Sequence, residues 1–214
     1  MSNFEYIIAS LPFLTADYRY QDGQGFESVL REIRENLSDK DNALVDDLLQ
    51  GFDQEQLGPD FYARMLRHPN RFLREYFRFD LNLRNAKVRY LNAALGRDPE
   101  QDVLTGAGTE EDEDLDIDLR RFSGGEFEEA AQADFVLHQG DLITREKGLD
   151  DLVWEAVDRL TAFHYFDIEA VLAYIAKLHI ANRWLALDEE EGRERFRRLV
   201  QEVRGTFKGV HYQA

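Results

Sequence analysis

Histidine, cysteine, aspartate and glutamate are the residues that most often bind metal ions, so their spacing is the first place to look for chemistry. The chain has no cysteine, which removes disulfides, thiol nucleophiles and cysteine metal ligands. Its five histidines show neither HxxxH nor HxH spacing, so no two imidazoles are placed to share one ion. They are His68, His138, His164, His179 and His211. His179 lies in a largely apolar stretch and is interpreted as a core or boundary histidine.

One acidic string resembles a calcium loop only superficially. Aspartates stand at every second position from Asp112 to Asp118. The string lacks the glycine that forms the sharp turn of such a loop, and it lacks the bidentate glutamate at the twelfth position. A solvated acidic loop is the better interpretation, and the sequence predicts no metal site.

Nucleotide and nucleophile motifs are absent as well. The chain contains no GxxxxGK[ST], no lysine that follows a glycine, and no GxSxG elbow. "FSGGE" at 122–126 is able to begin a helix with free N–H groups, but such a glycine pair is more often a loop. With 43 acidic residues, carboxylate pairs arise by chance and single out no acid and base. The sequence therefore predicts no catalytic residue and no cofactor.

Composition restricts the class of protein further. Of 214 residues, 43% are hydrophobic, including 15 Phe and 9 Tyr, which is typical of a globular core. A formal net charge of −17 argues against nucleic-acid binding, because phosphates would be repelled. No apolar run approaches the roughly 20 residues of a membrane-spanning helix. "MSNFEYIIASLPF" lacks a basic leader and a cleavage site, so we expect a cytoplasmic protein.

Apolar residues recur with helical spacing along most of the chain. Ser38 or Asp39 is expected to cap a helix that stops at Gly51, and Pro59 suits a first helical turn. Residues 6–14 are compatible with either a short strand or a helical turn. The expected helices begin near 26, 39 and 59 and then span about 69–95, 126–138, 149–163 and 167–187, with a last helix from 188.

The fold class expected from this pattern is all-α, because β-branched alternation is almost absent. Ten acidic residues lie between Asp98 and Asp118, together with Gly106 and Gly108, and this composition favours a mobile acidic linker. The sequence thus predicts two helical bundles of long amphipathic helices. The N-terminal lobe covers residues 1–97, the linker 98–120 and the C-terminal lobe 121–214.

The longest predicted helix is unexpectedly basic for so acidic a protein. Residues 64–97 hold nine basic residues, eight of them arginine, against Glu75 and Asp80, so the segment has a net charge of +7. One interpretation is that this helix packs against acidic parts of its own protein, such as Asp46, Asp47 or the linker. The other is a docking face for an acidic partner, which suits the planar, multidentate guanidinium group of arginine.

Three segments carry a resemblance to a known group of proteins. "REYFRFDLNLRNAKVRYLNAALGRD" (74–98) has an aromatic-rich helix leading into an Arg-Asn pair and ending in Leu-Gly-x-Asp. "YIIASLPFL" (6–14) and "FDIEAVLAYIAKLHIANRWLALDEEEG" (166–192) agree in order with it. Together they resemble a bacterial family of uncharacterised proteins whose genes lie among those for V-type (A/V-type) ATPase subunits.

That family is in turn similar to the C (or d) subunit of V-type ATPases, an all-helical protein that caps the membrane rotor ring and receives the central axle. The chain is shorter than that three-lobed subunit, and Pro12 interrupts its first helix. The resemblance implies a non-catalytic coupling subunit that links the axle to the ring. It implies a cytoplasmic location peripheral to the inner membrane, with membrane contact only through the complex. The partner-binding residues that it suggests are Arg71, Arg74, Arg78, Arg84, Asn85 and Arg89.

Two alternatives stay open at this point. A soluble helical adaptor unrelated to the ATPase would use the same basic face for another acidic protein. An enzyme with a carboxylate-lined pocket between its two lobes would instead have a deep cavity with strongly perturbed carboxylates.

Overall fold

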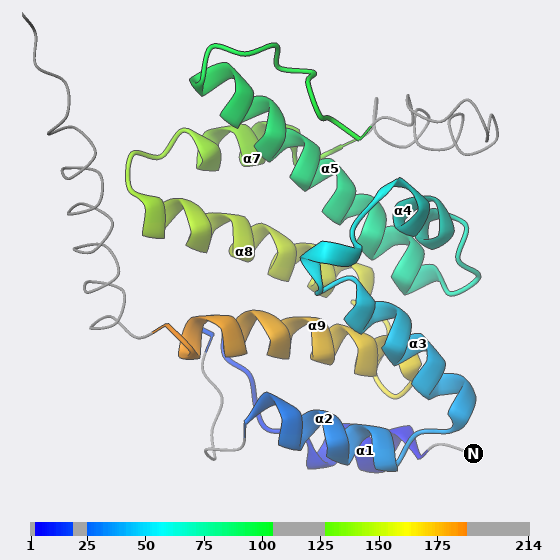
Figure 1. The fold of residues 1–214 in the computed structure, drawn as a ribbon. Helices are drawn as coiled ribbons and strands as arrows, with labels where there is room; N and C mark the ends of the chain where they lie inside the picture. Colours follow the sequence, from blue (N-terminus) through cyan, green and yellow to red (C-terminus); the bar gives the residue numbers. More distant parts are fainter. Residues whose placement is uncertain (1–2, 19–24, 105–126, 188–214) are drawn as a thin grey trace, which may run out of the picture.

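The fold is entirely helical in the part of the chain that the structure describes, which confirms the predicted class. The computed structural model describes residues 3–18, 25–104 and 127–187. Within these ranges it has eight α-helices, one short 3₁₀ helix and no strand (Figure 1). The helices are α1 (Phe4–Ser10), α2 (Phe26–Glu35), α3 (Asp39–Gln50), η1 (Gln54–Gln56), α4 (Pro59–Leu66), α5 (Arg71–Ala94), α7 (Ala130–Leu137), α8 (Leu142–Leu160) and α9 (Ile168–Leu185).

Local capping chemistry explains where the helices begin. The Ser38 side chain accepts a hydrogen bond from the amide of Asp41 at the start of α3. In the same way Asn70 caps α5 and Asp167 caps α9, each with a side-chain oxygen 3.0 Å from a backbone nitrogen three residues later. These bonds satisfy N–H groups that have no partner inside the helix. The predicted starts of α3, α4 and α9 are confirmed.

Two elements differ from the expectation. The segment at 6–14, left open between strand and helix, forms α1, which ends at Ser10 before Pro12. Helix α8 starts at Leu142 rather than near 149, because Asp141 caps it by accepting from the amide of Thr144 at 2.7 Å. The predicted last helix, from 188, lies outside the described residues.

Helix α9 occupies the centre of the molecule and contacts α1, α2, α3, α5 and α8 (Figure 1). Its apolar face is fully buried, and Val171, Leu172 and Ile175 are each 0% exposed. The largest core cluster joins these residues to Val29 of α2 and Phe72 of α5. The helices that precede residues 98–120 and those that follow them therefore share one core. The division into two lobes stays a prediction, but the described helices of the two sides are packed together.

A second, smaller cluster lies where α5, α7 and α8 meet. It is built from Phe79 and Leu83 of α5 with residues of the other two helices, among them Leu137 and Leu149. Helix α5 thus takes part in both clusters, its N-terminal half in the first and its middle in the second. This position fixes the direction of every side chain on α5, including the predicted partner-binding residues.

Residues 98–104 run back along α5, and we call them the strap. Helix α5 ends at Ala94, and Gly96 has a φ of +66°, which lets the chain reverse. The Asn92 side chain then donates to the carbonyl of Gln101 at 2.6 Å, and Asn85 binds the backbone of Leu104. The first seven residues of the predicted mobile linker are therefore held against α5. The remainder of that linker, 105–120, lies outside the described residues. None of the described helices is long and apolar enough to cross a membrane.

Candidate partner-binding site on helix α5

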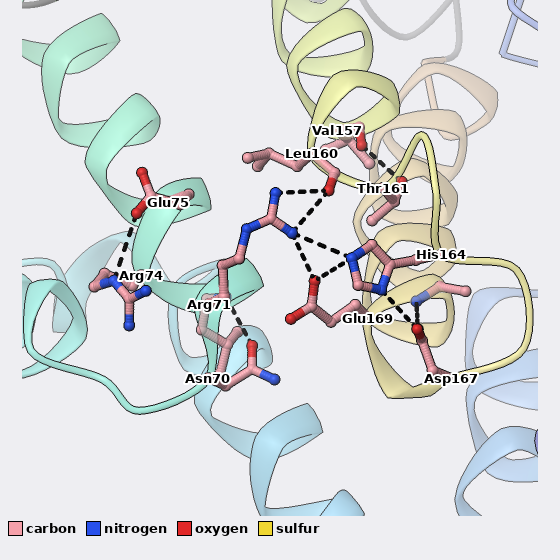
Figure 2. Close-up of polar contacts among 12 residues, drawn as sticks. Asn70, Arg71, Arg74, Glu75, Val157, Leu160, Thr161, His164, Asp167 and Glu169 are labelled. Atoms are coloured by element: carbon pink, nitrogen blue, oxygen red, sulfur yellow. Dashed lines mark hydrogen bonds and ion pairs between the residues drawn. The ribbon is translucent and has the colours of Figure 1, made fainter.

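Arg71, at the start of α5, connects three helices through one guanidinium group. Its Nη1 lies 3.2 Å from a carboxylate oxygen of Glu169 on α9, and both terminal nitrogens donate to the carbonyl of Leu160 at the end of α8 at 3.3 Å. Figure 2 shows this guanidinium between the two helices, beside His164. Because the last carbonyls of a helix have no partner inside it, Arg71 also caps α8.

His164 completes this cluster from the loop between α8 and α9. Its Nδ1 lies 2.6 Å from Asp167, and its Nε2 lies 3.3 Å from Glu169 and 3.2 Å from Arg71 (Figure 2). Asp167 uses its other carboxylate oxygen to cap α9. The arrangement joins an imidazole, two carboxylates and a guanidinium, all with partners inside the protein, so it holds the α8–α9 turn against α5.

One turn further along α5, two arginines surround a single carboxylate. Glu75 lies 3.4 Å from the Nε of Arg74 and 3.1 Å from Arg78. Arg74 also donates to the carbonyl of His68 at 2.8 Å. Both side chains are about one-third exposed, so each has an internal partner and an outward surface.

Arg84 belongs to a half-buried polar group. Its Nε donates to Asp80 at 2.7 Å, and the hydroxyl of Tyr62 on α4 donates to the same oxygen at 2.6 Å. Burial of Arg84 opposes its charge and lowers its pKa, but Asp80, Tyr62 and Tyr76 together outweigh this effect, so the pKa of the guanidinium is raised. Burial, reinforced by Asp80, raises the pKa of the Tyr62 hydroxyl as well. The ion pair lies within α5, and the hydrogen bond from the Tyr62 hydroxyl to Asp80 connects α4 to it.

The last two predicted residues bind the strap. Arg89 makes a two-pronged contact with Glu100, at 2.8 and 3.0 Å. Asn85 is only 2% exposed, and its amide both donates to and accepts from the backbone of Leu104, each at 3.0 Å. The partner-binding role suggested for Asn85 has to be corrected: its side chain is enclosed and its hydrogen-bonding groups are already used.

For each basic residue, the contacts show whether it pairs with an acidic residue of the same protein. Arg89 pairs with the strap, and Arg64, in the same basic segment, pairs with Asp47 at 2.6 Å. Asp46, also named as an internal partner, pairs with Arg34 of α2 instead. Packing against the protein's own acidic residues is confirmed for these contacts. Each of the five candidate arginines has an internal acidic partner, yet all keep between 32% and 48% of the side chain exposed.

A polar cluster that sequence reasoning missed lies where α8 meets α9. Asp150 is 6% exposed and accepts hydrogen bonds from Arg183 and from the indole of Trp184, the latter at 2.6 Å. Burial raises the pKa of Asp150, although both partners act in the opposite direction. Burial also lowers the pKa of nearby Lys87 on α5. No sequence signal points to this cluster, because Arg183 and Trp184 lie more than 30 positions from Asp150 and meet it only through helix packing.

Two neighbouring cavities lie along α5, the first between α5 and α7 and the second between α5, residues 127–129 and α8, and together we call them the α5–α7 groove. One has a volume of about 530 Å³ and includes Arg89, and the other has a volume of about 510 Å³ and includes Arg78. They share two lining residues, Asn82 and Phe127. Two of the predicted partner-binding arginines therefore stand at a concave surface. Within the described ranges, no group of three histidines or carboxylates is placed to hold a metal ion.

Comparison with known proteins adds one match. A family model described as "Protein of unknown function (DUF2764)" matches residues 47–206, roughly three quarters of the chain. The matched region starts within α3 and covers α4, α5, α7, α8 and α9. No curated protein and no solved structure matches the chain.

Proposed function

The chain belongs to the DUF2764 family, and from this starting point we propose that it is a non-catalytic coupling subunit of a bacterial V-type ATPase. In this role it links the central axle to the membrane rotor ring, and it lies at the inner membrane only through the complex. The proposal is supported by the resemblance of three separate segments to proteins encoded among ATPase subunit genes. The observation that carries it in the structure is the row of half-exposed arginines on a helix anchored in two core clusters.

A coupling subunit transmits force through its surfaces, so it needs stiffness more than reactive groups. Helix α5 is 24 residues long, and tertiary contacts hold it over most of its length. At its ends it is tied by Arg71 to α8 and α9 and by Arg89 to the strap. A dense, well-packed interior transmits displacement with little compression. These features indicate that α5 is held rigidly, as a coupling role requires.

The arginines are available as a contact surface even though each has an internal partner. A guanidinium has five N–H donors, and one carboxylate satisfies at most two of them with good geometry. The exposed edge of Arg89, for example, remains able to bind a second carboxylate beside Glu100. An acidic surface on the axle or on polar loops of the ring would therefore add to the existing ion pairs without breaking them.

The direct experiment is to purify the ATPase from the native host and to ask whether this protein is part of it. We expect co-purification in a fixed ratio to the rotor subunits. Absence of the protein from an intact, active complex would end the proposal.

Charge reversal tests the surface itself. Arg89→Glu is preferable to Arg84→Glu, because reversal at Arg84 would bury a second carboxylate beside Asp80 and Tyr62. We expect Arg89→Glu to weaken co-purification while the protein stays folded. Arg34→Glu is the matched control, since Arg34 is also about one-third exposed and paired with a carboxylate, that of Asp46, but lies on α2. Equal retention of both variants would argue against the α5 surface.

A specific observation favours the second candidate, a helical adaptor unrelated to the ATPase. Large apolar side chains are exposed at the α8–α9 turn, with Phe163 89% and Tyr165 66% exposed, and Phe13 lies in the same region at 73%. Such clusters are typical of protein-binding surfaces. A stable complex with a protein other than the ATPase subunits, in cells whose ATPase lacks this chain, would support the adaptor.

A further inference from the structure

Large apolar side chains are exposed at the side of the molecule where the described residues stop, at Leu187. Helices α5, α7 and α9 end on this side and α8 begins there, at the left in Figure 1. We call this side the apolar end. Gathered apolar side chains that stay exposed are typical of a binding surface. Those at or beside these helix ends are all more than half exposed: Leu95, Phe135, Leu142, Ile143, Leu185 and Leu187.

Contacts between the helices hold the apolar end together. The ring of Tyr90 on α5 lies 5.1 Å from the ring of His138, which follows α7, and 5.2 Å from the guanidinium of Arg145 on α8. The indole of Trp184, near the end of α9, donates to Asp150 of α8 at 2.6 Å. A segment that covers the start of α8 is therefore also close to the ends of α7 and α9.

The sequence that follows Leu187 contains a segment of matching character. A last helix is predicted from 188, and its apolar residues recur with the i, i+3, i+4, i+7 spacing of a single helix face. They are Phe196, Leu199, Val200 and Val203, and we call them the C-terminal row. The family match extends to residue 206, so it includes the whole row. Such a pattern is typical of a segment that covers one face with an apolar surface.

The C-terminal row is close enough in sequence to reach the apolar end. Residues 188–195 separate the row from Leu187 and would span about 12 Å as a helix. Packed helices lie about 8–10 Å apart, so this length is enough to pass from α9 to its neighbour α8. The exposed aromatic residues of the α8–α9 turn lie at the opposite end of the 18-residue α9, about 27 Å away. The nearer surface requires the shorter connection, which costs less entropy to close.

Charge favours the same location. Residues 134–151 hold five acidic residues against Arg145 and Lys147, a net charge of −3. Acidic and basic residues balance over 188–214, but four of the acidic residues come first, at 188–191. Residues 193–204 then hold five arginines against two glutamates, a net charge of +3. Opposite charges favour this segment as the occupant, whereas a symmetric dimer would bring two acidic surfaces together.

We propose that residues 196–203 dock on the apolar end of the same chain, with the C-terminal row covering Leu142 and Ile143 at the start of α8. Docking removes apolar side chains of both surfaces from water, which stabilises the bound arrangement. The aromatic residues of the α8–α9 turn then remain as the exposed apolar surface for partners. The proposal does not depend on the ATPase assignment, since it follows from the apolar end and the C-terminal row.

Disulfide trapping in the full-length protein tests the proposal, because the chain has no cysteine of its own and introduced thiols react only with each other. Ile143→Cys is combined in turn with Leu199→Cys and Val203→Cys on the row. Gln201→Cys is the control, since position 201 lies on the opposite face of the predicted helix. We expect a row cysteine to form the disulfide at least about tenfold faster than the control, because docking raises its effective concentration at Ile143.

A second control places the partner cysteine at the far end of α9, as Phe163→Cys, where the side chain is 89% exposed. Equal rates with Ile143→Cys and Phe163→Cys, or no reaction with either, would overturn the proposal. Equal rates for the row and for Gln201→Cys would overturn it too. A disulfide-linked dimer on a non-reducing gel, in place of a linked monomer, would identify a second copy as the occupant. None of these results bears on co-purification with the ATPase, so the two proposals are tested separately.

Discussion

At the scale of single residues, the three buried asparagines of α5 show how one side chain serves different purposes. The side-chain amides of Asn85 and Asn92 form hydrogen bonds with the backbone of the strap. They therefore stabilise a connection that has no regular secondary structure. Asn82 has no such partner within the described part of the chain, although it is almost as deeply buried. Among the described residues, no polar atom of the Asn82 side chain is both enclosed and without a partner, so its carboxamide is open to water at the cavities that it lines.

Substitution by leucine separates these roles. Asn82→Leu removes a carboxamide that is open to water and bonds no described residue, so it is expected to change the free energy of unfolding by less than about 1 kcal/mol. Asn85→Leu leaves the N–H and C=O of Leu104 unsatisfied and is expected to lower the free energy of unfolding by about 2–4 kcal/mol. Thermal unfolding followed by circular dichroism measures both. Equal destabilisation by the two variants would show that Asn82 is structural.

His179, interpreted from sequence as a core or boundary histidine, is half-buried on α9 and stacked on Phe52 with ring centroids 3.9 Å apart. Burial, aided by the charge of Arg183, lowers the pKa of His179 to about 4. In the unfolded chain the same imidazole binds a proton near its ordinary pKa of about 6.5. Between these values the unfolded state takes up more protons, so stability falls as the pH falls.

The expected loss from His179 is about 3 kcal/mol between pH 7 and pH 4. His179→Phe preserves the ring stack but cannot be protonated, so it should lose less stability over this range. Denaturant unfolding at a series of pH values measures the difference in free energy of unfolding between the two proteins. In this difference the contributions of the carboxylates that both proteins share cancel. Parallel curves for wild type and variant would contradict the buried, neutral state of His179.

At the scale of elements, local sequence signals set most helix ends, but packing decides which positions tolerate change. Gly51 ends α3 with an ordinary φ of −69°, so its backbone makes no demand for glycine. A Cβ at this position would nevertheless lie 2.2 Å from a ring carbon of the fully buried Phe77 on α5. The reason for glycine here is close approach of two helices, which the sequence alone did not reveal.

Gly51→Ala is therefore expected to lower the free energy of unfolding by about 1–3 kcal/mol through overpacking. Gly140→Ala is the matched control, because a Cβ at Gly140 would meet no atom within 4 Å. The control should change stability by less than about 0.5 kcal/mol. Chemical denaturation measures both, and similar effects of the two substitutions would show that backbone entropy matters more than contact with Phe77.

The candidate site could be predicted from the sequence only in part. Nine basic residues in one helical stretch are visible in the sequence, so the row of arginines could be predicted. The partners of these arginines could not be predicted. Arg71 meets Glu169 only because a distant helix packs beside it, and Arg89 meets Glu100 only because the chain reverses after α5. Asn85 was assigned to the surface because its helical position does not reveal that the strap covers it.

At the scale of the whole molecule, the helices on both sides of the acidic segment share the core around α9. We therefore expect one cooperative unfolding transition. Trp154 and Trp184 lie on α8 and α9 and both pack against Tyr18, so their fluorescence reports on this region. Far-ultraviolet circular dichroism reports on all the helices. The two denaturant curves should coincide. A fluorescence transition separated from the helical one would support two independent lobes, and a fragment of residues 1–97 that folds alone would do the same.

The sequence by itself determined the helical class, most of the helix starts and the basic character of α5, because periodicity, caps and composition act over a few neighbouring residues. Tertiary structure decided which arginines have partners, which asparagines are enclosed, how the strap returns and where the α5–α7 groove opens. Those outcomes depend on contacts between residues tens of positions apart, and a long-range contact leaves no mark in the local pattern of a single chain.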